Sequence, residues 1–118
     1  MAVEQCYVYA RKKWNAKYPN NKLVVDANII SGPQLWENAS GCGYSTSSDS
    51  AVANSIVCWD DGGYGHVAWV RSVNSNGTMN ISESNWPLNV GPTDRNNIAF
   101  DTRGASSQFA LLGCVYPS

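Results

Sequence analysis

Two short segments of alternating polarity, joined by turn residues, constrain the fold more than any other part of this chain. The first runs from Gly63 to Val70 and the second from Ile81 to Trp86. In each segment successive side chains alternate between two faces, as expected for a strand with one buried face. Asn76-Gly77 lies between them and is the strongest short signal for a tight turn. The sequence therefore predicts an antiparallel β-hairpin.

This hairpin brings three polar side chains to one face. A two-residue turn pairs Ala68 with Asn85, and a four-residue loop pairs Ala68 with Glu83. In both registers His66, Glu83 and Asn85 emerge on the same face, because only an odd-length loop would reverse the alternation. His66 is the only histidine of the chain. A carboxylate or an amide beside it would fix the tautomer and orientation of its ring, so we expect a general base.

A nucleophile for such a base stands near the start of the chain, at Cys6. Residues from about Gln5 to Tyr18 are predicted to form a helix, because apolar side chains recur every three or four positions. The apolar stripe consists of Tyr7, Ala10, Trp14 and Tyr18. Cys6 would lie in the first helical turn, where unpaired backbone N–H groups and the helix dipole favour a thiolate. The acidic Glu4 just before it suits the same helix end.

The remaining chain predicts an α+β fold. A short helix is expected at Gln34–Ala39, followed by a serine- and glycine-rich loop at Ser40–Ser50. Ile56–Trp59 is an apolar run typical of a buried strand, and Phe109–Tyr116 reads as a closing strand. The segment Pro87–Asn97 is predicted to be a loop. With helices first and an antiparallel sheet afterwards, residues 1–118 are expected to form a single domain.

The charge balance argues against nucleic acid and membranes as partners. The formal net charge is −1, only 14% of the residues are charged, and no extended basic cluster is present. No apolar run approaches the length needed to span a bilayer, and the N-terminus does not resemble a signal peptide. The chain is thus expected to be an excised domain or a protein released without a cleaved leader.

The four cysteines allow two interpretations. Their even number is typical of two disulfides in an extracellular domain. If Cys6 is instead a free nucleophile, at most one disulfide can form among Cys42, Cys58 and Cys114, and its pairing is left open. A zinc site is not expected, because no Cys-x-x-Cys pair is present and His66 is the only histidine.

Taken together, these segments resemble the CHAP family, the cysteine, histidine-dependent amidohydrolases and peptidases. The matching segments run in the family's order and span nearly the whole chain. They are Gln5-Cys6, Ser55–Trp59, Gly65–Val70, Ser82–Trp86 and Val115–Pro117. A lone Gln-Cys would be weak evidence, whereas Gly-His-Val-Ala followed by Glu-x-Asn-Trp at hairpin spacing is specific.

The resemblance implies a papain-like (NlpC-type) α+β fold with N-terminal helices packed on an antiparallel sheet. It further implies Cys6 as nucleophile, His66 as base, and Glu83 and Asn85 as the polar partners of the imidazole. No cofactor and no metal are expected. The chain departs from the family in having Glu4 where a glycine often precedes Gln-Cys. It also has no room upstream of Cys6 for the calcium loop of some lysins.

The activity implied is hydrolysis of an amide bond in bacterial peptidoglycan, by a monomer acting on the cell wall outside the cytoplasm. The bond would be that of an N-acetylmuramoyl-L-alanine amidase or of a stem or cross-bridge endopeptidase. The alternatives are a small-molecule amidase of the same family and a catalytically silent module that binds wall or a partner. We expect Gln5 to contribute to an oxyanion hole. Tyr64, Trp69 and Trp86 are candidates for lining a substrate groove.

Overall fold

The computed structural model describes residues 5–23, 31–86, 89–103 and 109–118. Within these ranges the chain forms two helices and six strands. Their order is α1 (Cys6–Lys17), α2 (Gly32–Asn38), β1 (Tyr44–Ser47), β2 (Ser55–Asp60), β3 (His66–Val73), β4 (Met79–Glu83), β5 (Thr93–Ile98) and β6 (Ala110–Pro117). The prediction of helices followed by an antiparallel sheet is confirmed.

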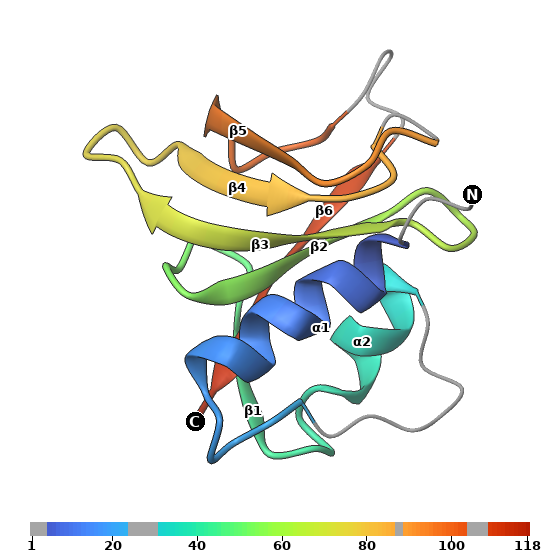
Figure 1. Ribbon diagram of the computed structural model, residues 1–118, viewed down its shortest axis with the longest axis vertical. Helices are drawn as coiled ribbons and strands as arrows, with labels where there is room; N and C mark the ends of the chain where they lie inside the picture. The colour runs from blue at the N-terminus through green and yellow to red at the C-terminus, as the bar shows by residue number, and fades with distance from the viewer. Residues whose placement is uncertain (1–4, 24–30, 87–88, 104–108) are drawn as a thin grey trace.

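The six strands form one antiparallel sheet in the order β1-β6-β2-β3-β4-β5. Both helices lie on the same side of this sheet (Figure 1), with α1 packed mainly on β3 and α2 packed on β2 and β6. The N-terminal end of α1 lies near the β2–β3 turn (Figure 1). This arrangement brings the first residue of α1 to the start of β3.

Alternation along the strands divides the core into two clusters, one on each face of the sheet. Beneath the helices, side chains such as Ile56, Val67 and Trp69 pack with the apolar stripe of α1. On the other face, Val57 and Ala68 pack with Met79, Ile81 and Phe109 among others. Because neighbouring residues of β2 and β3 enter different clusters, both faces of the central strands are buried.

Helix α1 begins at Cys6 and buries the predicted apolar stripe. Tyr7, Ala10 and Trp14 are buried, and Tyr18 packs at the edge of the same cluster. Gln5 is the N-cap residue, but its side chain makes no capping hydrogen bond. Glu4, expected to favour this helix end, lies outside the described residues. The predicted helix is therefore confirmed, and it places the thiol in the first turn.

Two segments expected to be loops contain strands. β1 lies within the predicted loop Ser40–Ser50, and all of β5 except its last residue, Ile98, lies within the predicted loop Pro87–Asn97. Both are at the edges of the sheet, and both are composed largely of polar residues. An edge strand pairs on one side only and can expose most of its side chains, so it lacks the apolar alternation that marks buried strands. The loop predictions were wrong for this reason.

The hairpin has an odd loop and nevertheless keeps the expected face. Val73 pairs with Met79, so residues 74–78 form a five-residue loop, whereas Trp69 pairs with Ser82. A bulge between Val70 and Ser72 inserts one extra residue into β3 and restores the alternation. On the side of the bulge that leads to His66 and Glu83, the pairing register is the one predicted for a four-residue loop.

The disulfide interpretation is not supported, because all four cysteines are free. Cys58 and Cys114 are buried in different clusters, on opposite faces of the sheet. Cys42 is exposed at the surface. The sequence could not exclude a disulfide, because it does not show which face each strand cysteine occupies.

Candidate active site

Cys6 lies at the start of α1 in contact with the first residues of β3. Burial raises the pKa of its thiol, whereas a hydrogen bond with His66 and the positive charge of that ring lower it. The backbone groups of Val67 and Tyr7 act in the same direction. The net result is a pKa below the usual value of 9.0, which favours the thiolate.

His66 is the first residue of β3, and 3% of its surface is exposed. Its Nε2–H donates to Glu83 Oε1 over 2.8 Å. With Nε2 engaged, Nδ1 is the ring nitrogen left to face Cys6. Burial lowers the pKa of the imidazole, but its hydrogen bonds and charge interactions with Cys6 and Glu83 raise it above 6.5. The opposite shifts of Cys6 and His66 favour a thiolate–imidazolium pair.

Aromatic rings hold the imidazole on several sides. Trp59, opposite His66 in the β2–β3 register, stacks on it with ring centroids 5.7 Å apart and planes inclined by 24°. Trp86 lies at 5.2 Å, and Phe109 meets the ring edge-on at 6.5 Å. We call Trp59, Trp86 and Phe109 the aromatic cage. It restricts rotation of the imidazole and limits access of water.

Glu83 ends β4 with 1% of its surface exposed. Arg95 Nε donates to Oε2 over 2.7 Å, and Arg103 Nη2 donates to the same oxygen over 2.6 Å. Arg103 Nη1 also donates to Oε1, the oxygen that accepts from His66. Burial raises the pKa of this carboxyl, but Arg103 first and His66 next lower it to about 2. Glu83 thus stays ionised and accepts a hydrogen bond from the imidazole.

Two glycines allow the backbone to close around His66. A side chain at Gly65, whose φ is +62°, would place its Cβ 2.1 Å from the carbonyl oxygen of Trp59. A Cβ at Gly32 would lie 2.7 Å from that same oxygen and 2.8 Å from the carbonyl oxygen of His66. The ends of β2 and β3 therefore pack against the start of α2 only because these positions have no side chain.

Asn85 and Gln5 occupy different surroundings from the Cys6–His66–Glu83 group. Asn85 has a φ of +62°, its Oδ1 accepts from the Asn89 backbone N–H over 2.7 Å, and its own N–H donates to Val90. It closes the loop after β4, and Glu83 is the partner that contacts His66. Gln5 is exposed and directly precedes Cys6 in the chain.

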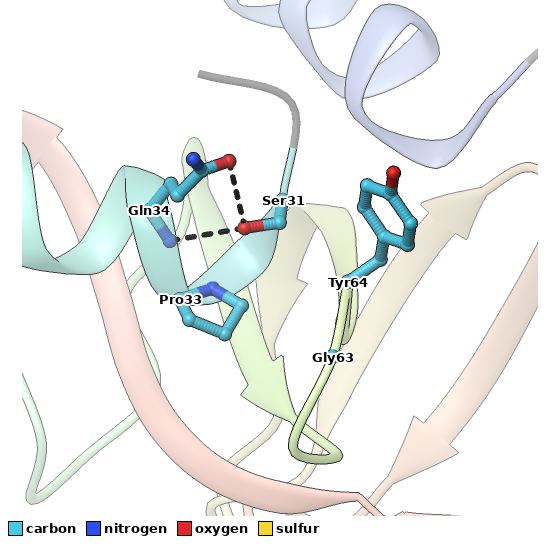
Figure 2. A pocket seen from close by; sticks show the side chains of 5 residues that line it. All are labelled: Ser31, Pro33, Gln34, Gly63 and Tyr64. Carbon is cyan, nitrogen blue, oxygen red and sulfur yellow. Dashed lines mark hydrogen bonds between the residues drawn. The ribbon is translucent and has the colours of Figure 1, made fainter. Parts of the chain in front are cut away.

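The three aromatic candidates for a substrate groove lie in three kinds of environment. Tyr64 is 70% exposed and lines a pocket of about 360 Å³ with Ser31, Pro33, Gln34 and Gly63. Figure 2 shows its ring extending from the β2–β3 turn, across from Ser31. Trp69 is 6% exposed and packs edge-on against Tyr18, so burial beneath α1 keeps it from a groove. Trp86 belongs to the aromatic cage.

Sequence reasoning missed both arginines of the site. Arg95 lies on the polar strand β5, and Arg103 forms an isolated antiparallel bridge with Phe109. Neither position belongs to a recognisable motif. One signal was available: a carboxylate on the buried face of a strand requires cationic partners. That signal predicts an arginine or lysine beside Glu83, but it does not say which.

Within the described part of the chain, no group of three or more histidine, cysteine, aspartate or glutamate residues could hold a metal ion. None of the helices described is both long and apolar enough to cross a membrane.

Comparisons with known proteins place these observations in a family. The CHAP domain matches residues 1–85, which include Cys6, His66 and Glu83. A Streptococcus mutans serotype c protein is 49% identical over 55 residues, covering 47% of this chain and 26% of that protein. N-acetylmuramoyl-L-alanine amidase sle1 of Staphylococcus saprophyticus is 43% identical over 56 residues, covering 48% of this chain and 17% of that protein.

The fold agrees with the sequence comparison. The crystal structure of an N-acetylmuramoyl-L-alanine amidase from Staphylococcus aureus superposes with a TM-score of 0.65 at 22% identity, covering 92% of this chain and 30% of that one. The chain thus spans about a third or less of these three proteins. Its sequence and its papain-like α+β architecture lead to one conclusion: the chain belongs to the CHAP domain family.

Proposed function

We propose that this domain is a peptidoglycan hydrolase that cleaves an amide bond through the Cys6 thiolate. The observation that carries the proposal is the continuous contact from Cys6 to His66 to Glu83, at the start of a helix and against a buried carboxylate. A nucleophile, a base and an orienting group in hydrogen-bond contact are the parts that acyl transfer requires.

In the proposed reaction the Cys6 thiolate attacks the amide carbonyl, and the carbonyl oxygen becomes an oxyanion. His66, protonated at the nitrogen facing Cys6, gives that proton to the leaving amine as the C–N bond breaks. A water molecule then attacks the thioester, with His66 taking its proton, and Cys6 leaves as thiolate. Glu83 holds the imidazole through Nε2 in both steps.

The remaining predicted residues have supporting roles in this proposal. The backbone N–H of Cys6 and the exposed side chain of Gln5 are the proposed oxyanion donors, each typically worth a few kcal/mol of transition-state stabilisation. Tyr64 is proposed to contact the sugar or stem peptide from the pocket beside the β2–β3 turn (Figure 2). Asn85 is proposed to act at a distance, by holding the loop that carries Trp86.

Among the amide bonds of peptidoglycan, the bond between N-acetylmuramic acid and L-alanine is the first to test. The Staphylococcus saprophyticus relative and the Staphylococcus aureus structure are both named N-acetylmuramoyl-L-alanine amidases. A stem or cross-bridge endopeptidase uses the same thiolate chemistry on a different amide. We propose that residues 1–118 act as one catalytic domain, as a monomer, on the cell wall outside the cytoplasm.

Digestion of purified sacculi followed by mass spectrometry tests the function and the bond together. The amidase reading predicts a new free amino group on L-alanine, whereas an endopeptidase would release amino groups within the stem or cross-bridge. Cys6→Ala should release none. Iodoacetamide at neutral pH should label Cys6 faster than the other thiols and stop the digestion. Sacculi left intact by the wild type, or cleaved equally by Cys6→Ala, would refute the proposal.

A further inference from the structure

The Glu83 carboxylate accepts more hydrogen bonds than it needs to orient a single histidine. Its two oxygens accept from His66, Arg95 and twice from Arg103, so the ordinary acceptor positions of the carboxylate are all used. Four such contacts fix the plane of the carboxylate as well as its position. Of the partners, only Arg103 contacts both oxygens.

Arg103 is itself fixed by the groups that fix the imidazole. Its guanidinium carbon lies 4.9 Å from the ring centre of Trp86 and 5.4 Å from that of Trp59. Both rings also pack against His66. Only 9% of the Arg103 side chain is exposed, and its backbone is paired with Phe109 in both directions. The guanidinium and the imidazole thus share one aromatic cage, with Glu83 joining them.

We propose that Arg103 is a positioning residue for the reaction. Its guanidinium fork, the pair of Nη1 and Nη2 donors, holds Glu83 so that Oε1 accepts from His66 Nε2. The other ring nitrogen is then left to exchange a proton with Cys6. The expected effect of Arg103 on catalysis rests on the proposed function. Arg103 lies beyond residues 1–85, the part of the chain that the CHAP domain matches.

The chemical reason concerns the tautomer of His66. An ionised Glu83 can only accept, so the proton of a neutral imidazole stays on Nε2. A protonated Glu83 could donate to Nε2 instead, which would move the ring proton to the nitrogen facing Cys6 and remove the base. The groups facing Glu83 are His66 from β3, Arg95 from β5, and Arg103. Without Arg103 the buried carboxyl keeps only Arg95 and His66, so its pKa should rise.

Arg95 differs from Arg103 in ways that make it a useful comparison. Its side chain is 33% exposed, and it reaches only Oε2, the oxygen that does not contact His66. Replacing Arg95 removes an equal charge without removing the fork. Arg11, exposed on α1, serves as the control for loss of a surface arginine. The substitution Arg11→Met is expected to leave activity unchanged.

The test combines hydrolysis of sacculi with NMR titration of His66, which is the only imidazole in the chain. Arg103→Met should lower kcat by about 10- to 100-fold, the cost typical of removing an outer partner that orients a metal-bound histidine, while KM changes little. Arg95→Met should lower kcat less. The His66 resonances of Arg103→Met should show an additional inflection between about pH 3 and pH 6, as Glu83 takes up a proton. The wild type should lack this inflection.

Arg103→Lys separates charge from geometry and also serves if Arg103→Met does not fold. The ammonium keeps Glu83 ionised but cannot form the fork, so kcat should fall without the additional inflection. The assignment would be overturned if Arg103→Lys had the kcat of the wild type. It would also be overturned if Arg103→Met folded, had the kcat of the wild type and showed a single His66 inflection. The titration needs no substrate. If the wild type fails to cleave sacculi, the proposed function fails, while the titration still decides whether Arg103 keeps Glu83 ionised.

Discussion

At the scale of single residues, the site depends on a few charges buried together. Cys6, His66 and Glu83 each lose hydration, and each is stabilised in its charged form by the next. The cost of burying one of them alone would exceed what a small domain can spare. Activity is therefore expected to depend on the group as a unit and not on any one pKa.

The pH dependence of kcat/KM follows from the directions of the two shifts. Cys6 must be deprotonated and His66 protonated, so activity falls below the pKa of Cys6 and above that of His66. The pKa of Cys6 is lowered and that of His66 is raised, and both shifts favour the coexistence of the thiolate and the imidazolium. We expect a bell-shaped profile with its maximum near neutral pH. A profile that rises steadily through pH 9 would instead indicate an ordinary thiol.

Glu83 and Asn85 are expected to differ when each is replaced. Glu83→Gln removes the negative charge and replaces one of the two acceptor oxygens with an N–H donor. It should lower kcat by up to about 10⁴-fold, as for the orienting carboxylate of a serine-protease triad. Asn85→Ala should mainly affect stability, by about 1–2 kcal/mol, because it places alanine at a φ of +62° and removes a loop hydrogen bond. Steady-state kinetics with urea unfolding separates the two effects. Equal losses of kcat would place Asn85 in direct contact with the imidazole.

At the scale of elements, the β3–β4 hairpin and the ends of β2 and β3 set the geometry. The bulge in β3 compensates for the odd loop, so a local irregularity far from the thiol decides which face carries Glu83. The close packing at Gly65 and Gly32 then presses the start of β3 against α2. The position of His66 is thus set by close backbone contacts among the ends of β2 and β3 and the start of α2.

Two glycines of the hairpin region offer a matched test of this packing. Gly65 and Gly77 both have positive φ, at +62° and +87°, but a Cβ at Gly77 would meet nothing within 4 Å. Gly77→Ala should therefore cost about 1 kcal/mol of stability and leave kcat unchanged. Gly65→Ala should cost more and also reduce kcat, because the Trp59 carbonyl must move away beside His66. Similar stability and kcat for both variants would show that the close approach is not required.

At the scale of the whole molecule, the ionised Glu83 links stability to pH. Its pKa is about 2 in the folded protein, against 4.5 for an unperturbed glutamate carboxyl. Because the folded pKa is depressed, this stabilisation is complete above about pH 4.5 and is lost as the pH falls toward about 2. Glu83→Gln should lower the free energy of unfolding at pH 7 by about 3–5 kcal/mol, since it leaves two arginines without their anion.

Denaturant unfolding of the wild type and of Glu83→Gln across the acid range checks this linkage. The difference in stability between the two proteins should shrink as the pH falls from about 4.5 to about 2. A difference that stays constant with pH would mean that Glu83 titrates alike in the folded and unfolded chains.

The sequence by itself determined the central hairpin, the first helix and the Cys6, His66 and Glu83 candidates, because these depend on local periodicity and turn chemistry. Only the tertiary structure decided the rest. The edge strands β1 and β5 take their conformation from their neighbours, not from their own polar residues. The choice of Glu83 over Asn85, and the closure of the site by Arg95 and Arg103, required distant segments to meet. A buried charge demands a partner, but its identity depends on which parts of the chain the fold brings together.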